Sequence, residues 1–152
     1  MAVQAQDAAP TVDASSMDEL NRCLNEAGDN PRGCIGKISN ECQQTAEGST
    51  TPGIVACVQK ETALWDRILN DRYKALMSST RERQEDATGW GQDADAVGKL
   101  RDAQRKWVAF RDAECERIFA YYVAGTIRGP VAASCQLSLT AERAIDLAPR
   151  KH

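Results

Sequence analysis

Apolar residues recur at helical spacing through most of the chain, and no stretch alternates between apolar and polar residues as a β-strand does. The pattern predicts helices over about 17–27, 34–46, 51–86 and 96–122, and a last helix that follows Pro130 and stops at Pro149. Two of these helices are long and the others are short. The predicted fold is therefore all-α, an antiparallel helical bundle built on two long helices with shorter flanking helices.

Capping and turn signals predict where these helices end. Ser16 is the expected N-cap of the first helix, with Glu19 completing a capping box. Thr51 followed by Pro52 marks the start of the longest helix. The stretch 87–98, rich in glycine and aspartate, is the clearest loop because it interrupts every helical period.

The length of 152 residues suits one compact domain, which we expect to span 17–149 after a flexible segment 1–16. No stretch approaches the roughly 20 apolar residues that a membrane helix needs. The opening residues also lack the apolar centre of a signal peptide. We expect a mature, exported chain whose leader was removed before Ala2 or within the opening segment, an expectation that rests on the cysteines.

The net charge of −3 is unevenly distributed along the chain. Residues 1–50 hold eight acidic and three basic residues, whereas residues 101–152 hold six acidic and nine basic ones. Nucleic-acid binding is not indicated, because it needs a concentrated basic face. The acidic first third favours attraction of a cationic protein, although a solvated surface is the simpler interpretation.

Six cysteines without a C-x-x-C spacing favour disulfides over a zinc site or a redox pair. Of the many connectivities that six cysteines allow, the local one pairs Cys23 with Cys34, Cys42 with Cys57, and Cys115 with Cys135. Three disulfides in a chain of this size indicate an oxidising compartment, the periplasm or the extracellular space. Six reduced thiols in a cytosolic protein are the alternative.

A bond between Cys115 and Cys135 constrains the turn that separates their helices. Cys115 lies ten residues before Gly125, whereas Cys135 lies only six after Gly129, so two straight helices would place the sulfurs at different heights. We expect residues 118–122 to bend or unwind so that this bond can close.

Arg111 is charged and lies beside Phe110, where helical spacing predicts an apolar stripe. A guanidinium half-buried between helices must find carboxylates and carbonyls, and its planar fork suits that task. We interpret Arg111 as a clamp between helices, and its candidate partners on the facing helix are Glu61, Asp66 and Asn70. The residues expected to form the structural network are Glu61, Asn70, Gln104, Trp107, Arg111, Glu114, Thr140 and Arg143.

Catalytic chemistry is poorly supported. The single histidine is the terminal His152, which argues against Ser-His-Asp, Cys-His and histidine-rich metal sites. Neither "GWG" nor "GTIRG" resembles a nucleotide-binding loop, so no cofactor is expected. A glycosidase-like pair drawn from Glu61, Asp66 and Glu114 is the remaining enzymatic alternative, but these residues are predicted to lie in a close seam beside Arg111.

Trp90 is the strongest candidate for partner binding, because a tryptophan between two glycines on a polar loop has no helix face to bury it. Tyr121 and Tyr122, just before the second glycine-containing turn, are candidates of the same kind. In the alternative interpretation these aromatic residues fold back and cover an end of the bundle.

Several segments together resemble a known family. They are "CIGKISNEC", "IVAC" leading into "KETALWDRILNDRYKAL", "AQRKWVAFRDAEC" and "CQLSLTAER", which span about residues 34–147. These segments are similar to the bacterial LprI-like domain family, named for lysozyme inhibition. In the resemblance Cys115 and Cys135 match the family's late cysteine pair and Cys42 and Cys57 its early pair, while Cys23 lies outside the common core.

The resemblance implies an exported, disulfide-bonded, helical protein, and three functions follow from it and from the residues. The first is a periplasmic or secreted inhibitor that binds lysozyme or another cationic envelope protein through an acidic face and loop aromatics. The second is a helical binding or scaffold module of the envelope without inhibitory activity. The third is an enzyme that acts on glycans.

Overall fold

The structure is a computed structural model that describes residues 12–92 and 94–150. Its elements are α1 (Ala14–Glu26), the 3₁₀ helix η1 (Pro31–Cys34), α2 (Lys37–Gln43), α3 (Thr51–Gly89), α4 (Ala96–Tyr121) and α5 (Arg128–Asp146). All secondary structure in the described ranges is helical, which confirms the predicted all-α class. None of these helices is both long enough and apolar enough to cross a bilayer.

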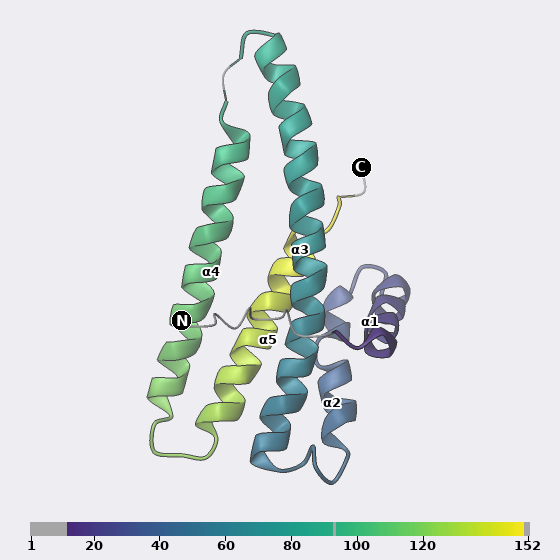
Figure 1. Ribbon diagram of the computed structural model, residues 1–152, viewed down its shortest axis with the longest axis vertical. Helices are drawn as coiled ribbons and strands as arrows, with labels where there is room; N and C mark the ends of the chain where they lie inside the picture. Colours follow the sequence, from purple (N-terminus) through teal and green to yellow (C-terminus); the bar gives the residue numbers. More distant parts are fainter. Residues whose placement is uncertain (1–11, 93, 151–152) are drawn as a thin grey trace, which may run out of the picture.

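The longest helix, α3, organises the rest of the molecule. In Figure 1, α3 and α4 run antiparallel along the long axis, α5 lies between their lower halves, and α1 and α2 lie on the other side of α3. The side chains that form the core come mainly from α3 and α5. They include Val58, Leu64, Trp65, Leu69, Leu137, Ala141 and Ala144, joined by Leu20 of α1 and Ile38 of α2.

Three disulfides join the helices in the local pattern. Cys23–Cys34 links α1 to η1, Cys42–Cys57 links α2 to α3, and Cys115–Cys135 links α4 to α5, with Cα–Cα distances of 5.9, 5.6 and 5.5 Å. Each bond therefore fastens two consecutive elements of the chain rather than distant ones.

The start of α1 differs from the sequence prediction. The N-cap is Asp13 instead of Ser16, and its carboxylate accepts hydrogen bonds from the Ser16 hydroxyl at 2.8 Å and from the Ser15 N–H at 3.2 Å. These two bonds hold the pKa of the Asp13 carboxyl below its usual value. The helix gains a turn because an aspartate caps at least as well as a serine, so part of the expected flexible segment 1–16 is helical. Residues 1–11 of that segment lie outside the described residues.

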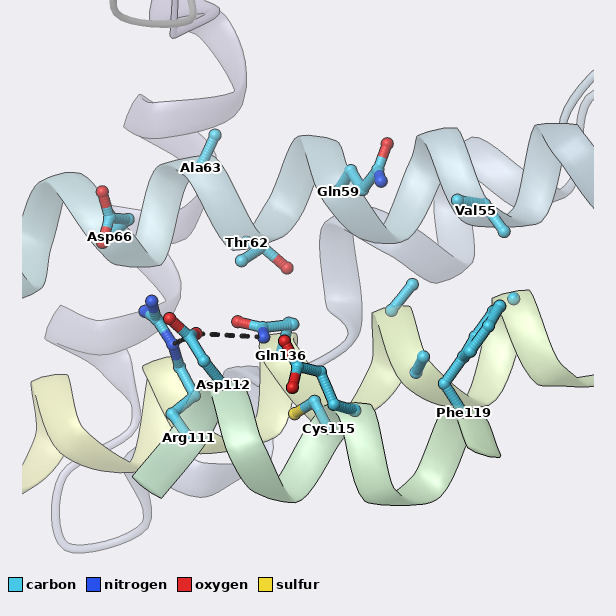
Figure 2. A pocket seen from close by; sticks show the side chains of 14 residues that line it. Val55, Gln59, Thr62, Ala63, Asp66, Arg111, Asp112, Cys115, Phe119 and Gln136 are labelled. Carbon is cyan, nitrogen blue, oxygen red and sulfur yellow. Dashed lines mark hydrogen bonds and ion pairs between the residues drawn. The ribbon is translucent and has the colours of Figure 1, made fainter. Parts of the chain in front are cut away.

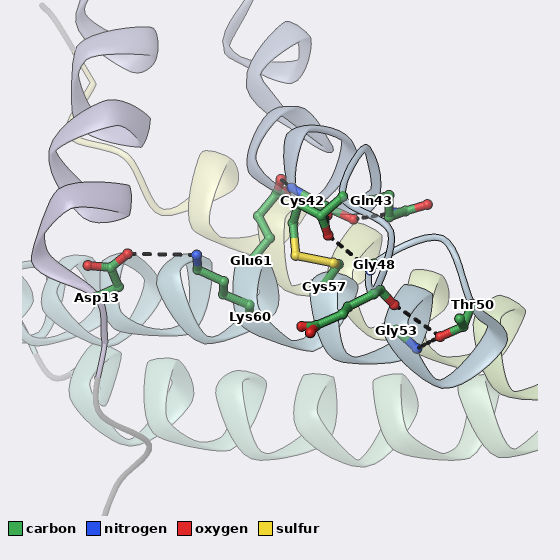
Figure 3. The surroundings of a disulfide bond; sticks show 12 residues. Asp13, Cys42, Gln43, Gly48, Thr50, Gly53, Cys57, Lys60 and Glu61 are labelled. Atoms are coloured by element: carbon green, nitrogen blue, oxygen red, sulfur yellow. Dashed lines mark hydrogen bonds and ion pairs between the residues drawn. A yellow bond between two sulfur atoms is a disulfide. The ribbon is translucent and has the colours of Figure 1, made fainter.

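The expected helix 34–46 is divided in two. Gly36 has a φ of +94°, a left-handed conformation, and separates η1 from α2. The N-terminus of α2 is capped from another helix. Glu61 of α3 accepts from the Gly36 N–H at 2.8 Å and from the Ser39 N–H at 3.0 Å, beside the Cys42–Cys57 bond (Figure 3).

Glu61 is fully buried and belongs to this cap. Its carboxylate also accepts from the indole N–H of Trp65 at 3.1 Å, so three donors surround it. A negative charge at a helix N-terminus is stabilised by the helix dipole and by the free N–H groups of the first turn. The contacts of Glu61 with α2 differ from the predicted pairing with Arg111.

A second charged residue of α3 supports the opposite end of another helix. Arg72 donates from Nη1 to the carbonyl of Ala144 at 2.6 Å, in the last turn of α5. Partial burial lowers the pKa of the Arg72 guanidinium. A cation at a helix C-terminus satisfies free carbonyls and complements the dipole. Glu61 and Arg72 are charged residues among the apolar side chains that α3 turns inward, and each of them contacts the end of another helix.

The connection between α2 and α3 requires glycine because the chain turns back closely on itself. A Cβ atom at Gly53 would overlap with the carbonyl oxygen of Glu47, and Thr50 accepts from the Gly53 N–H at 3.1 Å as the N-cap of α3. Thr51 is the first residue of α3, as predicted. At its other end α3 continues past residue 86 to Gly89, so the loop is shorter than 87–98.

The expected bend near the Cys115–Cys135 bond is wrong. α4 is helical through Tyr121, and the chain leaves the helix only at Tyr122. The two sulfurs meet at equal heights because α5 begins at Arg128, before Pro130 rather than after it. Proline is tolerated in a first helical turn, where its missing N–H has no partner to lose.

Removal of the Cys115–Cys135 bond is expected to destabilise the bundle without changing its helical fold. The double variant Cys115→Ser with Cys135→Ser should lose about 3 kcal/mol of unfolding free energy, because the 20-residue loop that the bond closes then gains freedom in the unfolded chain. Chemical denaturation followed by circular dichroism measures this loss.

Mass mapping of the non-reduced wild-type chain should recover the three local disulfide pairs. Free thiols in denatured, unreduced material would contradict these pairs.

Candidate functional site

A groove runs between α3, α4 and α5 on one face of the molecule. Its floor is α5 and its walls are α3 and α4, as Figure 2 shows from close by. The volume of the groove is about 790 Å³. The groove exists because α5 presents the small residues Gly129, Ala132 and Ala133 to it. The side chains that line the walls are Val55, Gln59, Thr62, Ala63 and Asp66 from α3, and Arg111, Asp112, Cys115, Glu116 and Phe119 from α4.

The ionisable side chains of the groove are three carboxylates and one guanidinium, so the groove is acidic. Asp112 is engaged at its centre, where its Oδ1 accepts from Arg111 at 3.0 Å and from the Gln136 amide at 3.3 Å (Figure 2). Asp66 accepts from Asn70 at 3.3 Å. Such a groove offers hydrogen-bond acceptors to a polar or cationic group.

The wall of the groove at Arg111 continues into a cluster between α4 and α5. The Arg111 guanidinium lies 5.1 Å from the centre of the Trp107 ring, and its Nη1 donates to the Thr140 hydroxyl at 3.4 Å. Arg143 approaches the same ring at 5.8 Å and donates to Gln104 at 3.0 Å. The structure thus brings five of the predicted network residues into contact, with Trp107 between two arginines.

Three other predicted network residues lie elsewhere. Glu61 caps α2, and Asn70 is exposed and contacts only its own helix through Asp66. Glu114 forms a two-pronged ion pair with Arg117 one turn further along α4, and this pair holds the pKa of the Glu114 carboxyl below its usual value. Glu114 is half-buried, with a side chain that is 30% exposed, and its carboxylate is occupied by Arg117 rather than by Arg111.

The choice between Phe110 and Arg111 is settled by exposure. Phe110 is 56% exposed, whereas the Arg111 side chain is only 18% exposed. The face that α4 turns inward carries Leu100, Gln104 and Trp107, all partly buried. The charged residue is therefore the inward one, and the aromatic residue beside it faces solvent.

The three carboxylates of the enzymatic alternative do not converge. Asp66 lines the groove, Glu61 faces α2 with three donors around its carboxylate, and Glu114 pairs with Arg117. A glycosidase needs two carboxyls that flank one open cleft, and of these three predicted carboxylates only Asp66 lines the groove. No cluster of metal-binding side chains occurs within 12–92 and 94–150, and His152 lies outside these residues.

The candidate partner-binding residues occupy opposite ends of α4. Trp90 follows the end of α3 at the tip of the α3–α4 hairpin and is 86% exposed. Tyr121 and Tyr122 lie at the other end, 74% and 40% exposed, with their rings edge to face. Since the 26 residues of α4 span about 38 Å, these aromatic residues form two separate surfaces.

The sequence did not identify the groove residues Asp112, Glu116, Phe119 and Gln136 as a group. Their only signal is the run of small residues at the start of α5, which becomes meaningful once the register of α5 against α4 is known. That register follows from the Cys115–Cys135 bond, which ties the two helices beside the groove.

The acidic first third of the chain forms a surface on α1 and α2. Asp18, Glu19 and Glu26 of α1 lie around one shallow depression that also includes Arg22 and Lys37. Glu41 of α2 is a neighbour of Glu19, and a hydrogen bond with Glu19, together with desolvation and the charge of Glu19, raises the pKa of the Glu41 carboxyl. The carboxylates on this surface therefore repel one another.

Replacement of Glu41 by glutamine is expected to raise stability at neutral pH. A raised pKa means that the folded chain binds this proton more tightly than the unfolded chain, so stability falls as pH rises from the ordinary glutamate pKa through the raised one. Above both values the penalty is complete, and Glu41→Gln removes it. Melting temperatures at neutral and strongly acidic pH measure the effect, which should appear only at neutral pH; Glu47→Gln is the control. An equal shift at both pH values would contradict the interpretation.

A protein-family model described as "Lysozyme inhibitor LprI" matches residues 42–147, which run from the end of α2 through the last residue of the core. The chain belongs to the LprI family. The match contains both long helices, α5 and two of the three disulfides, while α1, η1 and the Cys23–Cys34 bond precede it. The matched region begins at residue 42, eight residues after residue 34, where the sequence resemblance to the family begins. Neither the curated proteins nor the solved structures gave a significant match.

Membership in the LprI family bears on function and location. The family is one of lysozyme inhibitors and not of enzymes. The disulfides and the family together indicate an extracytoplasmic protein. In this LprI-family chain the Arg111 cluster lies within the matched region and joins α4 to α5.

Proposed function

We propose that this protein is a periplasmic or secreted inhibitor that binds a lysozyme-type peptidoglycan hydrolase. The observation that carries the proposal is the match to the lysozyme-inhibitor family over residues 42–147, which includes the whole body of α3, α4 and α5. The three disulfides support the compartment, because such a chain keeps them only in an oxidising environment.

Charge supports a cationic partner. The chain has a net charge of −3, and its carboxylates gather on α1, in the groove and near the hairpin tip. Complementary charge accelerates the encounter of two proteins more than it strengthens the final complex. The association rate constant with a cationic lysozyme should therefore fall as salt is raised, while the dissociation rate constant changes little.

A turnover assay tests the proposal. Lysozyme at a fixed concentration digests a cell-wall suspension in the presence of increasing amounts of the oxidised protein, and turnover should fall towards zero at micromolar excess. The reduced and alkylated chain is the matched control, because it has the same composition and charge without the three bonds. Undiminished turnover with the oxidised chain would refute the proposed function.

The alternative is an envelope binding module without inhibitory activity, and the end of the α4–α5 hairpin favours it. Large apolar side chains gather there in exposed positions: Phe119, Tyr121, Tyr122, Val123 and Ile127. Contiguous exposed apolar residues of this kind mark a protein-binding surface. Binding measured beside turnover separates the two functions, since a complex that forms with lysozyme while turnover continues supports the binding module.

A further inference from the structure

We propose that the tip of the α3–α4 hairpin is the inhibitory element and that Trp90 inserts into the glycan-binding cleft of the hydrolase. The inference rests on the proposed function and specifies how it is carried out. Three features support it: the hairpin projects from the core, Trp90 lies on an ordered turn, and the residues around it are acidic.

The hairpin projects beyond the core of the protein. α5 ends where Arg72 contacts its last turn, and α3 continues for 17 residues from there to Gly89, a distance of about 25 Å. The last fully buried residue of α3 is Leu69, and the tip half of α4 contributes no buried residue. Figure 1 shows the two helices alone at this end of the molecule. A narrow rod that adds little to the core is suited to enter a concave surface.

The turn at the tip fixes the backbone conformation on both sides of Trp90. Trp90 is the C-cap of α3, and Gly91 follows with a φ of +77°. The Gly91 N–H donates to the Thr88 carbonyl at 3.0 Å, and the Gln92 N–H donates to the Ala87 carbonyl at 2.9 Å. This is the Schellman arrangement, which requires a left-handed residue and therefore favours glycine at 91.

The two helices are also joined across the tip. The amide oxygen of Gln84 accepts from the Val97 N–H of α4 at 2.9 Å, and Asp95 caps α4 by accepting from the Gly98 N–H at 2.9 Å. The backbone that carries the indole is therefore ordered before binding, and only the side-chain rotamer has to be fixed in the complex. Its 86% exposure has no function in the fold, because the indole covers no core residue.

Charge around the tip fits the same partner. Between Arg83 and Lys99 the sequence has four acidic residues and no basic one. Three of them, Glu85, Asp86 and Asp95, lie within the described residues of the tip. They steer the tip towards a positively charged surface. The indole, which is flat and apolar with one N–H donor, has the chemistry of a group that fills a sugar-binding subsite lined by apolar and hydrogen-bonding side chains.

The experiment measures the inhibition constant of Trp90→Ala against lysozyme. Loss of an interface anchor of this kind should raise the inhibition constant about thirtyfold or more. Trp90→Phe should restore part of the inhibition. Phe110→Ala, which removes another exposed aromatic side chain of the hairpin, is the matched control and should inhibit as the wild type does. All three variants should keep the wild-type melting temperature, because neither side chain is buried.

Competition locates the contact. Tri-N-acetylchitotriose, a soluble fragment that occupies the cleft, should raise the apparent inhibition constant of the wild-type protein linearly with the concentration of the fragment. The inference is overturned if Trp90→Ala inhibits as strongly as the wild-type protein, or if the fragment does not compete. It is also overturned if only Tyr121→Ala loses inhibition. In these cases the proposed function stands, whereas a wild-type protein that never inhibits refutes the function itself.

Discussion

Glutamine in place of Glu61 is expected to lower the free energy of unfolding by about 3 kcal/mol, although the two side chains have nearly the same shape. The carboxylate of Glu61 accepts from Gly36, Ser39 and Trp65, and it is fully buried. An amide offers one oxygen and one NH₂ group. Whichever way the amide is oriented, its NH₂ group meets a donor, and at least one N–H loses its partner.

The charge contributes to this loss as well. A carboxylate at the N-terminus of α2 interacts favourably with the helix dipole, and its hydrogen bonds are stronger than those of a neutral acceptor. Glu61→Ala removes the acceptor altogether and leaves three donors around a small cavity. It should therefore cost more than Glu61→Gln, on the order of 5 kcal/mol.

Urea denaturation followed by far-UV circular dichroism measures both losses. Asp71→Asn is the matched control, because it makes the same acid-to-amide change on α3 in an exposed pair with Arg67 at 3.7 Å. Exposed pairs of this kind contribute about 0 to 1 kcal/mol, so the control should melt close to the wild type. If Glu61→Gln were as stable as Asp71→Asn, the carboxylate would not be the cap of α2.

The fold was predictable from the sequence because its signals are local. Helical spacing, turn residues and the order of the cysteines all act over short separations, and each disulfide joins consecutive elements. The helix ends were less predictable where two capping residues compete. At α1, Asp13 and Ser16 are both good caps, and the cap that adds a turn of helix prevails.

The partners of buried charges were the part that the sequence could not assign. Glu61 lies in the stripe of α3 where a contact with α4 was expected, but its acceptors are used by α2 on the other side of the helix. A periodic pattern identifies a face only to within about a quarter of the helix circumference. The choice between two neighbouring helices therefore depends on tertiary packing.

The candidate surfaces also differ in whether a local sequence signal predicts them. Trp90 and the tyrosines 121 and 122 were identified from aromatic residues beside turns, a local signal, and the structure leaves all three exposed. Their distance from one another follows from the length of α4, which the sequence also predicted. The groove arises from the register of α5 against two other helices, and no local pattern contains it.

Arg111→Ala is the second change with a large expected effect, a loss of about 2 to 3 kcal/mol of unfolding free energy. The guanidinium contacts the Trp107 ring, the Asp112 carboxylate and the Thr140 hydroxyl, and Thr140 is fully buried. The contact with Asp112 contributes little, because the Asp112 side chain is 50% exposed and water screens the pair. Most of the loss therefore comes from the ring contact, from the packing of the arginine stem and from the unsatisfied hydroxyl.

Arg111→Lys separates charge from geometry. Lysine keeps a cation near Trp107, but a single ammonium cannot reach Asp112 and Thr140 at once while it lies over the ring. Its loss should fall between those of the wild type and Arg111→Ala. Arg105→Ala, which removes an exposed arginine from the same helix, is the control for the loss of a positive charge from α4.

A double-mutant cycle of Trp107→Leu and Arg111→Ala isolates the contact between the guanidinium and the Trp107 ring, which should appear as a coupling of about 1 kcal/mol. An unshifted denaturation curve for Arg111→Ala would show that α4 and α5 are held by the Cys115–Cys135 bond and apolar packing without this clamp.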